Sequence, residues 1–96
     1  MLPFIEELLE DNNEYTLVKR SFSRQLASQE LVWHRDKEDR SILVKEGRGW
    51  YIQLDNELPQ IMQKESIFKI PKETWHRIIN KNGTNLTIVI KKHKYL

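Results

Sequence analysis

The chain has 96 residues, of which 39% are hydrophobic and 31% are charged, a composition typical of one small folded domain rather than a disordered protein. It contains no cysteine, which excludes disulfides, thiolate nucleophiles and thiolate metal sites. The formal net charge of +2 is too small to favour nucleic acid as a partner. No long apolar run and no basic secretory-signal region occur, so we expect a cytoplasmic protein that does not bind membranes.

The first predicted element is a short helix within residues 1–14. Apolar residues recur there at helical spacing, namely Phe4, Ile5, Leu8 and Leu9. Pro3 suits a first helical turn, and the acidic residues that follow favour the helix dipole. Asp11 and the two asparagines after it would end the helix, so residues 1–14 are predicted to form an N-terminal helical segment.

From residue 15 onward the dominant periodicity is that of β-strands. The β-prone runs are residues 15–18, 31–34, 41–45, 50–54, 66–70, 77–80 and 86–90. Turn-forming residues separate most of them, and Asn82-Gly83 is a strong hairpin signal because both residues tolerate positive φ. These short strands predict an all-β sandwich or barrel over residues 15–96.

Strand alternation places several polar side chains on the apolar side of the predicted strands. Those at the centre of the candidate site are His34, Asp36, Arg40 and His76. Arg40, for example, shares a face with Ile42 and Val44. Two further residues, Tyr51 and Gln53, are candidate ligand donors if they face the interior. Charged groups in line with core positions are unusual for a solvated run, so this cluster is the predicted site.

The spacing of the cluster resembles the first motif of the cupins, which reads His-x-His, three or four residues, Glu, six residues and Gly. Counting back from Gly47, the glutamate position falls on Arg40, the second histidine on Asp36 and the first on His34. The resemblance implies a small cupin-type antiparallel β-barrel, the double-stranded β-helix or jelly roll. The interior of such barrels often holds one metal ion.

The second cupin motif is better preserved. It reads Gly, five residues, Pro-x-Gly, two residues, His, three residues and Asn. Pro71, His76 and Asn80 stand at this spacing, while Glu65 and Glu73 replace the glycines. The runs ELVWHRDKEDR, GWYIQLDNELP and IPKETWHR are also similar to short single-domain cupin-like proteins of tailed bacteriophages of marine bacteria. That likeness would place the protein in the host cytoplasm.

The resemblance implies metal ligands at His34, Asp36 and His76. Two histidines and one carboxylate suit Fe(II) and also tolerate Mn, Ni or Zn. Arg40 stands where the family has a carboxylate, and its permanent charge would repel a divalent ion. Alternatively, Arg40 replaces the metal by pairing with Asp36.

Three functions therefore stay open. The first is a metal-dependent oxygenase or isomerase acting on a small anionic molecule, with Arg40, Tyr51 and Gln53 binding that ligand. The second is a metal-free barrel that binds an anion, and the third is a structural or interaction barrel. The sequence identifies no catalytic residue. Because the core is small, a homodimer is also expected.

Overall fold

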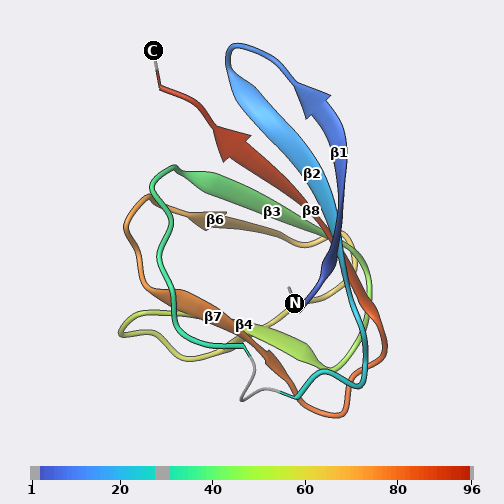
Figure 1. Cartoon of the computed structure of the whole chain (residues 1–96). Helices are drawn as coiled ribbons and strands as arrows, with labels where there is room; N and C mark the ends of the chain where they lie inside the picture. Colours follow the sequence, from blue (N-terminus) through green and yellow to red (C-terminus); the bar gives the residue numbers. More distant parts are fainter. Residues whose placement is uncertain (1–2, 28–30, 96) are drawn as a thin grey trace.

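The structure, a computed structural model, describes residues 3–27 and 31–95, and every regular element in these ranges is a β-strand. The strands are β1 (Ile5–Asp11), β2 (Tyr15–Phe22), β3 (Arg40–Glu46), β4 (Trp50–Leu54), β5 (Gln60–Ile61), β6 (Ile67–Ile70), β7 (His76–Asn80) and β8 (Leu86–His93). A five-stranded sheet of order β1-β2-β8-β3-β6 faces a three-stranded sheet of order β5-β4-β7 (Figure 1). The predicted all-β antiparallel architecture is confirmed.

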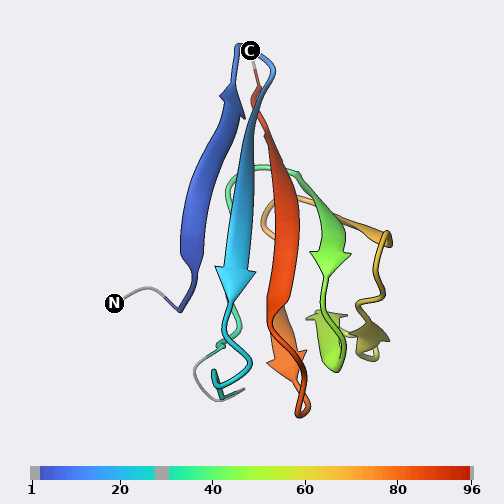
Figure 2. The same cartoon turned by 90° about the vertical axis from the view of Figure 1, so that its right-hand side faces the viewer.

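The predicted N-terminal helix is wrong. Ile5–Asp11 instead form β1, the edge strand of the larger sheet (Figure 2), while residues 1–2 lie outside the described ranges. The side-chain oxygen of Asn12 accepts hydrogen bonds from the backbone of Glu14 and Tyr15, which turns the chain back into β2. Glu6 then lies opposite Arg20 in the hairpin, as Glu7 does opposite Lys19. Cross-strand pairing of opposite charges therefore outweighs the helical spacing of the apolar residues.

The predicted strands differ from the observed ones mainly in length. Six of the seven predicted runs form strands, whereas residues 31–34 contribute only an isolated bridge between His34 and His76. The short strand β5 was not predicted. Among the described residues there is no helix long and apolar enough to cross a membrane.

The core fills the space between the two sheets. Its largest fully buried side chains are Trp50, Ile52, Met62, Ile70, Leu86, Ile90 and Val44. The Trp50 indole nitrogen donates a 2.7 Å hydrogen bond to the carbonyl of Thr84, so its one polar atom is satisfied. Along β3 the inward positions run from Val44 to Ile42 and then to Arg40. Polar side chains thus lie at one end of an otherwise apolar core.

Candidate metal centre

A cavity of about 290 Å³ lies between the sheets at this polar end of the core. Its wall contains four of the predicted site residues, His34, Asp36, Arg40 and His76. Most of the remaining wall is apolar. The structure therefore brings together the side chains that strand alternation had placed on the inner face.

Backbone pairing holds the two histidines side by side. The backbone N–H of His34 donates to the carbonyl of His76 at 3.0 Å, and the N–H of His76 donates to the carbonyl of His34 at 2.8 Å. The centres of the imidazole rings are 4.3 Å apart. One isolated bridge thus positions the segment before β3 against β7.

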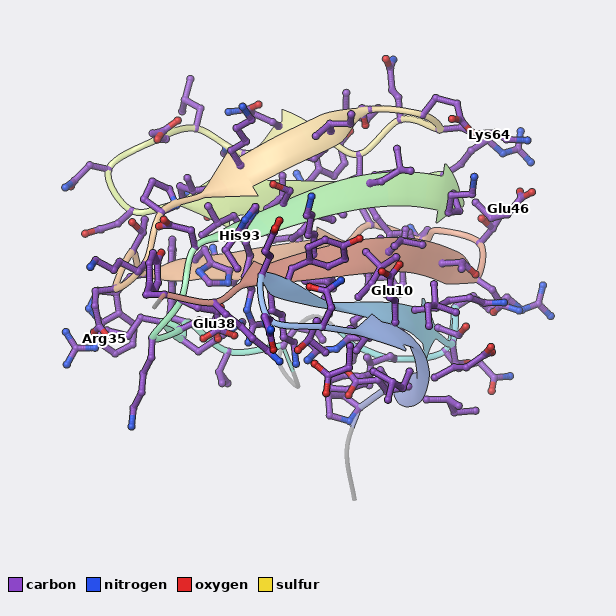
Figure 3. All side chains as sticks on the ribbon, turned by 90° about the horizontal axis from the view of Figure 1, so that it is seen from above. Glu10, Arg35, Glu38, Glu46, Lys64 and His93 are labelled. Atoms are coloured by element: carbon purple, nitrogen blue, oxygen red, sulfur yellow. The ribbon has the colours of Figure 1, made fainter. Side chains whose placement is uncertain are left out.

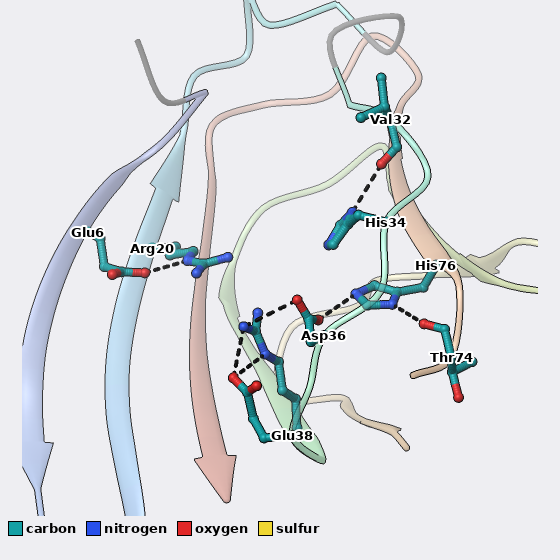
Figure 4. A network of polar contacts seen from close by, with 9 residues as sticks. Glu6, Arg20, Val32, His34, Asp36, Glu38, Thr74 and His76 are labelled. Atoms are coloured by element: carbon teal, nitrogen blue, oxygen red, sulfur yellow. Dashed lines mark hydrogen bonds and ion pairs between the residues drawn. The ribbon is translucent and has the colours of Figure 1, made fainter. Parts of the chain in front are cut away.

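Local carbonyl groups orient both imidazole rings. Nδ1 of His34 lies 3.0 Å from the Val32 carbonyl, and Nδ1 of His76 lies 2.8 Å from the Thr74 carbonyl (Figure 4). Because a carbonyl only accepts hydrogen bonds, each Nδ1 carries the hydrogen and, in the neutral ring, Nε2 presents a lone pair. Metal-binding histidines are oriented by the same kind of hydrogen bond.

Asp36 completes the cluster. Its Oδ2 atom lies 3.2 Å from Nε2 of His76 and its Oδ1 atom 3.3 Å from Nη2 of Arg40. Oδ2 is buried and accepts no hydrogen bond from any residue of the described ranges. Burial raises the pKa of Asp36, but His76, Arg40 and His34 together lower it by more, so the pKa falls below its ordinary value of 3.8. The carboxylate is therefore ionised at neutral pH.

Arg40 is bound by two carboxylates rather than one. Its Nε and Nη2 atoms donate to Oε1 of Glu38 at 3.2 and 3.0 Å, and the same Nη2 makes the longer contact to Asp36. The predicted ion pair with Asp36 is present, although the closer contacts go to Glu38. The segment before β3 thus folds back so that Glu38 neutralises much of the charge of Arg40.

Tyr51 and Gln53, predicted as ligand-binding residues, do not line the cavity. The inward positions of β4 belong to Trp50 and Ile52, both with no exposed surface. Tyr51 instead lies beneath the Lys81 ammonium group, 5.1 Å from the ring centre. Gln53 accepts a hydrogen bond from Arg77 and donates one to the carbonyl of Glu57. The structure thus corrects the expected orientation of both side chains.

Arg20 is a cavity residue that the sequence analysis missed. It shares one face of β2 with the buried residues Val18 and Phe22, the same signal that identified Arg40. The predicted strand ended at residue 18, four residues too early, so the alternation was not followed as far as Arg20.

The donor set fits a divalent metal ion. One ligand atom from each of His34, Asp36 and His76 can be chosen so that all three lie within 4.8 Å of one another. Imidazole nitrogen and carboxylate oxygen are ligands that Fe(II), Mn, Ni and Zn accept. The buried Oδ2 atom without a hydrogen bond is an acceptor that such an ion would satisfy.

No protein-family model matches the chain, and no curated protein matches it in sequence. Solved structures do resemble it. A candidate mannose-6-phosphate isomerase from Ralstonia eutropha superposes with a TM-score of 0.81 at 17% identity, covering 96% of this chain and 85% of that protein. An RmlC-like cupin from Methanocaldococcus jannaschii gives 0.76 at 15% identity, covering 94% and 79%. KdgF from a Halomonas species gives 0.76 at 16% identity, covering 97% and 82%.

The RmlC-like cupin is described as having a double-stranded β-helix fold. Its likeness and that of the other two structures extend over nearly the whole chain, whereas identities of 15 to 17% establish the fold alone. These structural likenesses, together with two facing antiparallel sheets and a polar cluster between them, show that this chain has the cupin fold.

Proposed function

We propose that this protein binds a divalent metal ion through His34, Asp36 and His76 and accepts a small anionic molecule in the adjoining cavity. The observation that carries the proposal is the buried Oδ2 atom of Asp36, which has no hydrogen-bond donor among the described residues and lies beside a lone pair of His76. A cation shared by these atoms removes their repulsion and satisfies both.

The three candidate ligands would contribute different groups to a bound metal ion. The histidines offer neutral nitrogen ligands, and Asp36 supplies a negative charge. A metal ion bound there would provide Lewis acidity and open positions for substrate or dioxygen. We therefore propose a metal-dependent oxygenase or isomerase, and the isomerase alternative draws support from the fold shared with the candidate isomerase of Ralstonia eutropha.

The first test is elemental analysis of protein purified without added metal or chelator, followed by calorimetric titration with Fe(II), Mn(II), Ni(II) and Zn(II). We expect near-stoichiometric binding that is lost in His76→Ala and in His34→Ala. His93→Ala is the matched control, because His93 lies at the end of β8 beside Ser41 and outside the ligand cluster. Metal binding that survives His76→Ala would refute the proposal.

A metal-free anion-binding barrel is the second candidate, and the 3.3 Å contact between Arg40 and Asp36 favours it. In that case the guanidinium supplies the positive charge that the metal supplies in the first candidate. Failure of all four metal ions to bind the wild-type protein would favour this second function.

We also propose that the protein is a homodimer in the cytoplasm of a phage-infected host. The homodimer draws support from β1, an edge strand whose Ile5 and Leu8 side chains are 78% and 61% exposed. Light scattering should give twice the monomer mass, and Leu8→Lys should return the monomer.

A further inference from the structure

The cavity carries a second guanidinium, that of Arg20, which reaches it from β2. Figure 4 shows this side chain pointing from the larger sheet toward the side on which His34 and Asp36 lie. A ligand in the cavity would therefore meet both the candidate metal ligands and the guanidinium of Arg20.

Arg20 is held in place but keeps free donors. Its Nε atom donates to Oε1 of Glu6, and its guanidinium lies 4.1 Å from the centre of the Phe4 ring. Its terminal nitrogens make no hydrogen bond to any described residue, although the side chain is only 15% exposed. Arg40, by contrast, already pairs with Glu38 and Asp36. Arg20 is therefore the better placed of the two to bind an anion.

The charges around the cavity are balanced unless a metal ion is bound. The positive residues are Arg20, Arg40 and Lys92, and the negative residues are Glu6, Glu38 and Asp36. These six charges cancel when the histidines are neutral, so without a metal ion it is the unpaired donors of Arg20, and not a net charge, that favour an anion. A bound divalent ion would add an excess of positive charge. Burial lowers the pKa of Lys92, and the neighbouring Arg40 and Arg20 lower it further. An anion near Arg20 would relieve this crowding.

The rest of the cavity wall indicates the chemical character of the ligand beyond its anionic group. The polar residues among the described lining are Arg20, His34, Asp36, Arg40 and His76, with no hydroxyl or amide side chain among them. The remaining lining is aliphatic or aromatic, as at Phe22, Ile52 and Ile88. Sugar hydroxyl groups buried against this aliphatic and aromatic part of the wall would lack hydrogen-bond partners, which costs binding energy, whereas a hydrocarbon body gains from leaving water.

We infer that Arg20 binds the anionic group of the ligand, and that the ligand is a small carboxylate with an apolar body rather than a sugar phosphate. This inference rests on the proposed function in taking the cavity as the ligand site. It does not require that a metal ion be bound. The 290 Å³ cavity lies near the lower limit for small-molecule pockets, in keeping with a ligand of this size.

Benzoate is the probe, with benzamide as its uncharged isostere and glucose 6-phosphate as the sugar phosphate. Each is titrated by NMR into metal-free protein and into protein incubated with Zn(II). We expect benzoate to shift resonances of cavity residues and to bind more tightly than either comparison compound. Arg20→Met should weaken benzoate binding by roughly tenfold or more, because a charge-assisted hydrogen bond is lost while the apolar stem remains.

Arg35→Met is the matched control. Arg35 also pairs with a glutamate, Glu73, and stacks on an aromatic ring, that of Trp75, but it extends outward from the barrel (Figure 3). Its removal should leave benzoate binding unchanged. Glu6→Gln gives a second test in the opposite direction, since it removes the anion that competes for Arg20. We expect benzoate to bind this variant several-fold more tightly.

Three results would overturn the inference: benzoate binding unaffected by Arg20→Met, benzamide binding as tightly as benzoate, or glucose 6-phosphate binding more tightly than benzoate. The metal proposal can fail separately. Arg20-dependent benzoate binding in a protein that binds no metal supports the inference and refutes the metal proposal. Metal binding without Arg20-dependent benzoate binding supports the metal proposal and refutes the inference about Arg20.

Discussion

Nε2 of His76 lies 3.2 Å from Oδ2 of Asp36, while Nδ1 of the same ring lies 2.8 Å from the Thr74 carbonyl. When His76 is neutral, its ring hydrogen sits on Nδ1. Nε2 and Oδ2 then each point a lone pair at the other atom, which is a repulsive contact. The contact becomes favourable when His76 is protonated or when a cation lies between the two atoms. Both outcomes add positive charge at one point of a largely apolar cavity.

Asp36→Asn separates a metal site from a structural ion pair. The asparagine amide can donate to Nε2 of His76, which replaces a repulsive contact by a hydrogen bond. Arg40 keeps its contacts to Glu38. We expect the free energy of unfolding of metal-free protein to change by less than about 1 kcal/mol, with metal binding lost. Urea unfolding and Zn(II) calorimetry measure the two effects, and a large loss of stability would favour a structural role.

Arg40→Met should have opposite effects on stability and on metal affinity. It leaves Asp36 and Glu38, whose side chains are 14% and 25% exposed, without their shared cation. Metal-free protein should lose about 2 kcal/mol of stability. Metal affinity should rise, because a fixed positive charge no longer competes for Asp36. Calorimetry of both proteins at one pH tests this, and a fall in metal affinity would mean that Arg40 positions Asp36 for the ion.

The two glutamates that replace motif glycines keep the glycine conformation. Glu65 and Glu73 have φ angles of 71° and 62°, in the left-handed region that disfavours side chains. Glu65→Gly should therefore raise the free energy of unfolding, by up to about 1 kcal/mol. Glu57→Gly is the control, since Glu57 is not among the positive-φ residues and should lose stability. Equal losses in both variants would show that the left-handed backbone at Glu65 is unstrained.

Asp39 predicts a pH dependence of stability. Hydrogen bonding by Tyr95, the Lys72 N–H at 2.7 Å and the charge of Lys72 hold the pKa of Asp39 below its ordinary value of 3.8. A carboxyl group whose pKa is lowered by folding stabilises the protein above its unfolded pKa, and this stabilisation is lost as the pH falls through the folded pKa. Wild type should exceed Asp39→Asn in urea midpoint near pH 6, and the gap should narrow near pH 3. A constant gap would contradict this account.

Short-range patterns in the sequence predicted most of the sheet and four of the five polar residues in the described lining of the cavity. Alternation placed Arg40 in line with Ile42 and Val44, and motif spacing brought His34, Asp36 and His76 together before any fold was known. Both predictions agree with the structure because alternate residues of a strand point to opposite faces, whatever the rest of the fold is. The motif residue Asn80 ends β7, and its side chain is hydrogen bonded to the backbone of Arg24, Leu26 and Gly83.

Only the tertiary structure decided the features that depend on a distant partner. Residues 5–11 form a strand because β2 offers basic side chains opposite their acidic ones, which helical spacing cannot reveal. Glu38 neutralises Arg40 because its turn folds inward, and Arg20 reaches the cavity because β2 continues beyond residue 18. Tyr51 and Gln53 point outward because Trp50 and Ile52 fill the core. Sequence alternation defines two faces of each strand, and packing against the opposite sheet selects which face is buried.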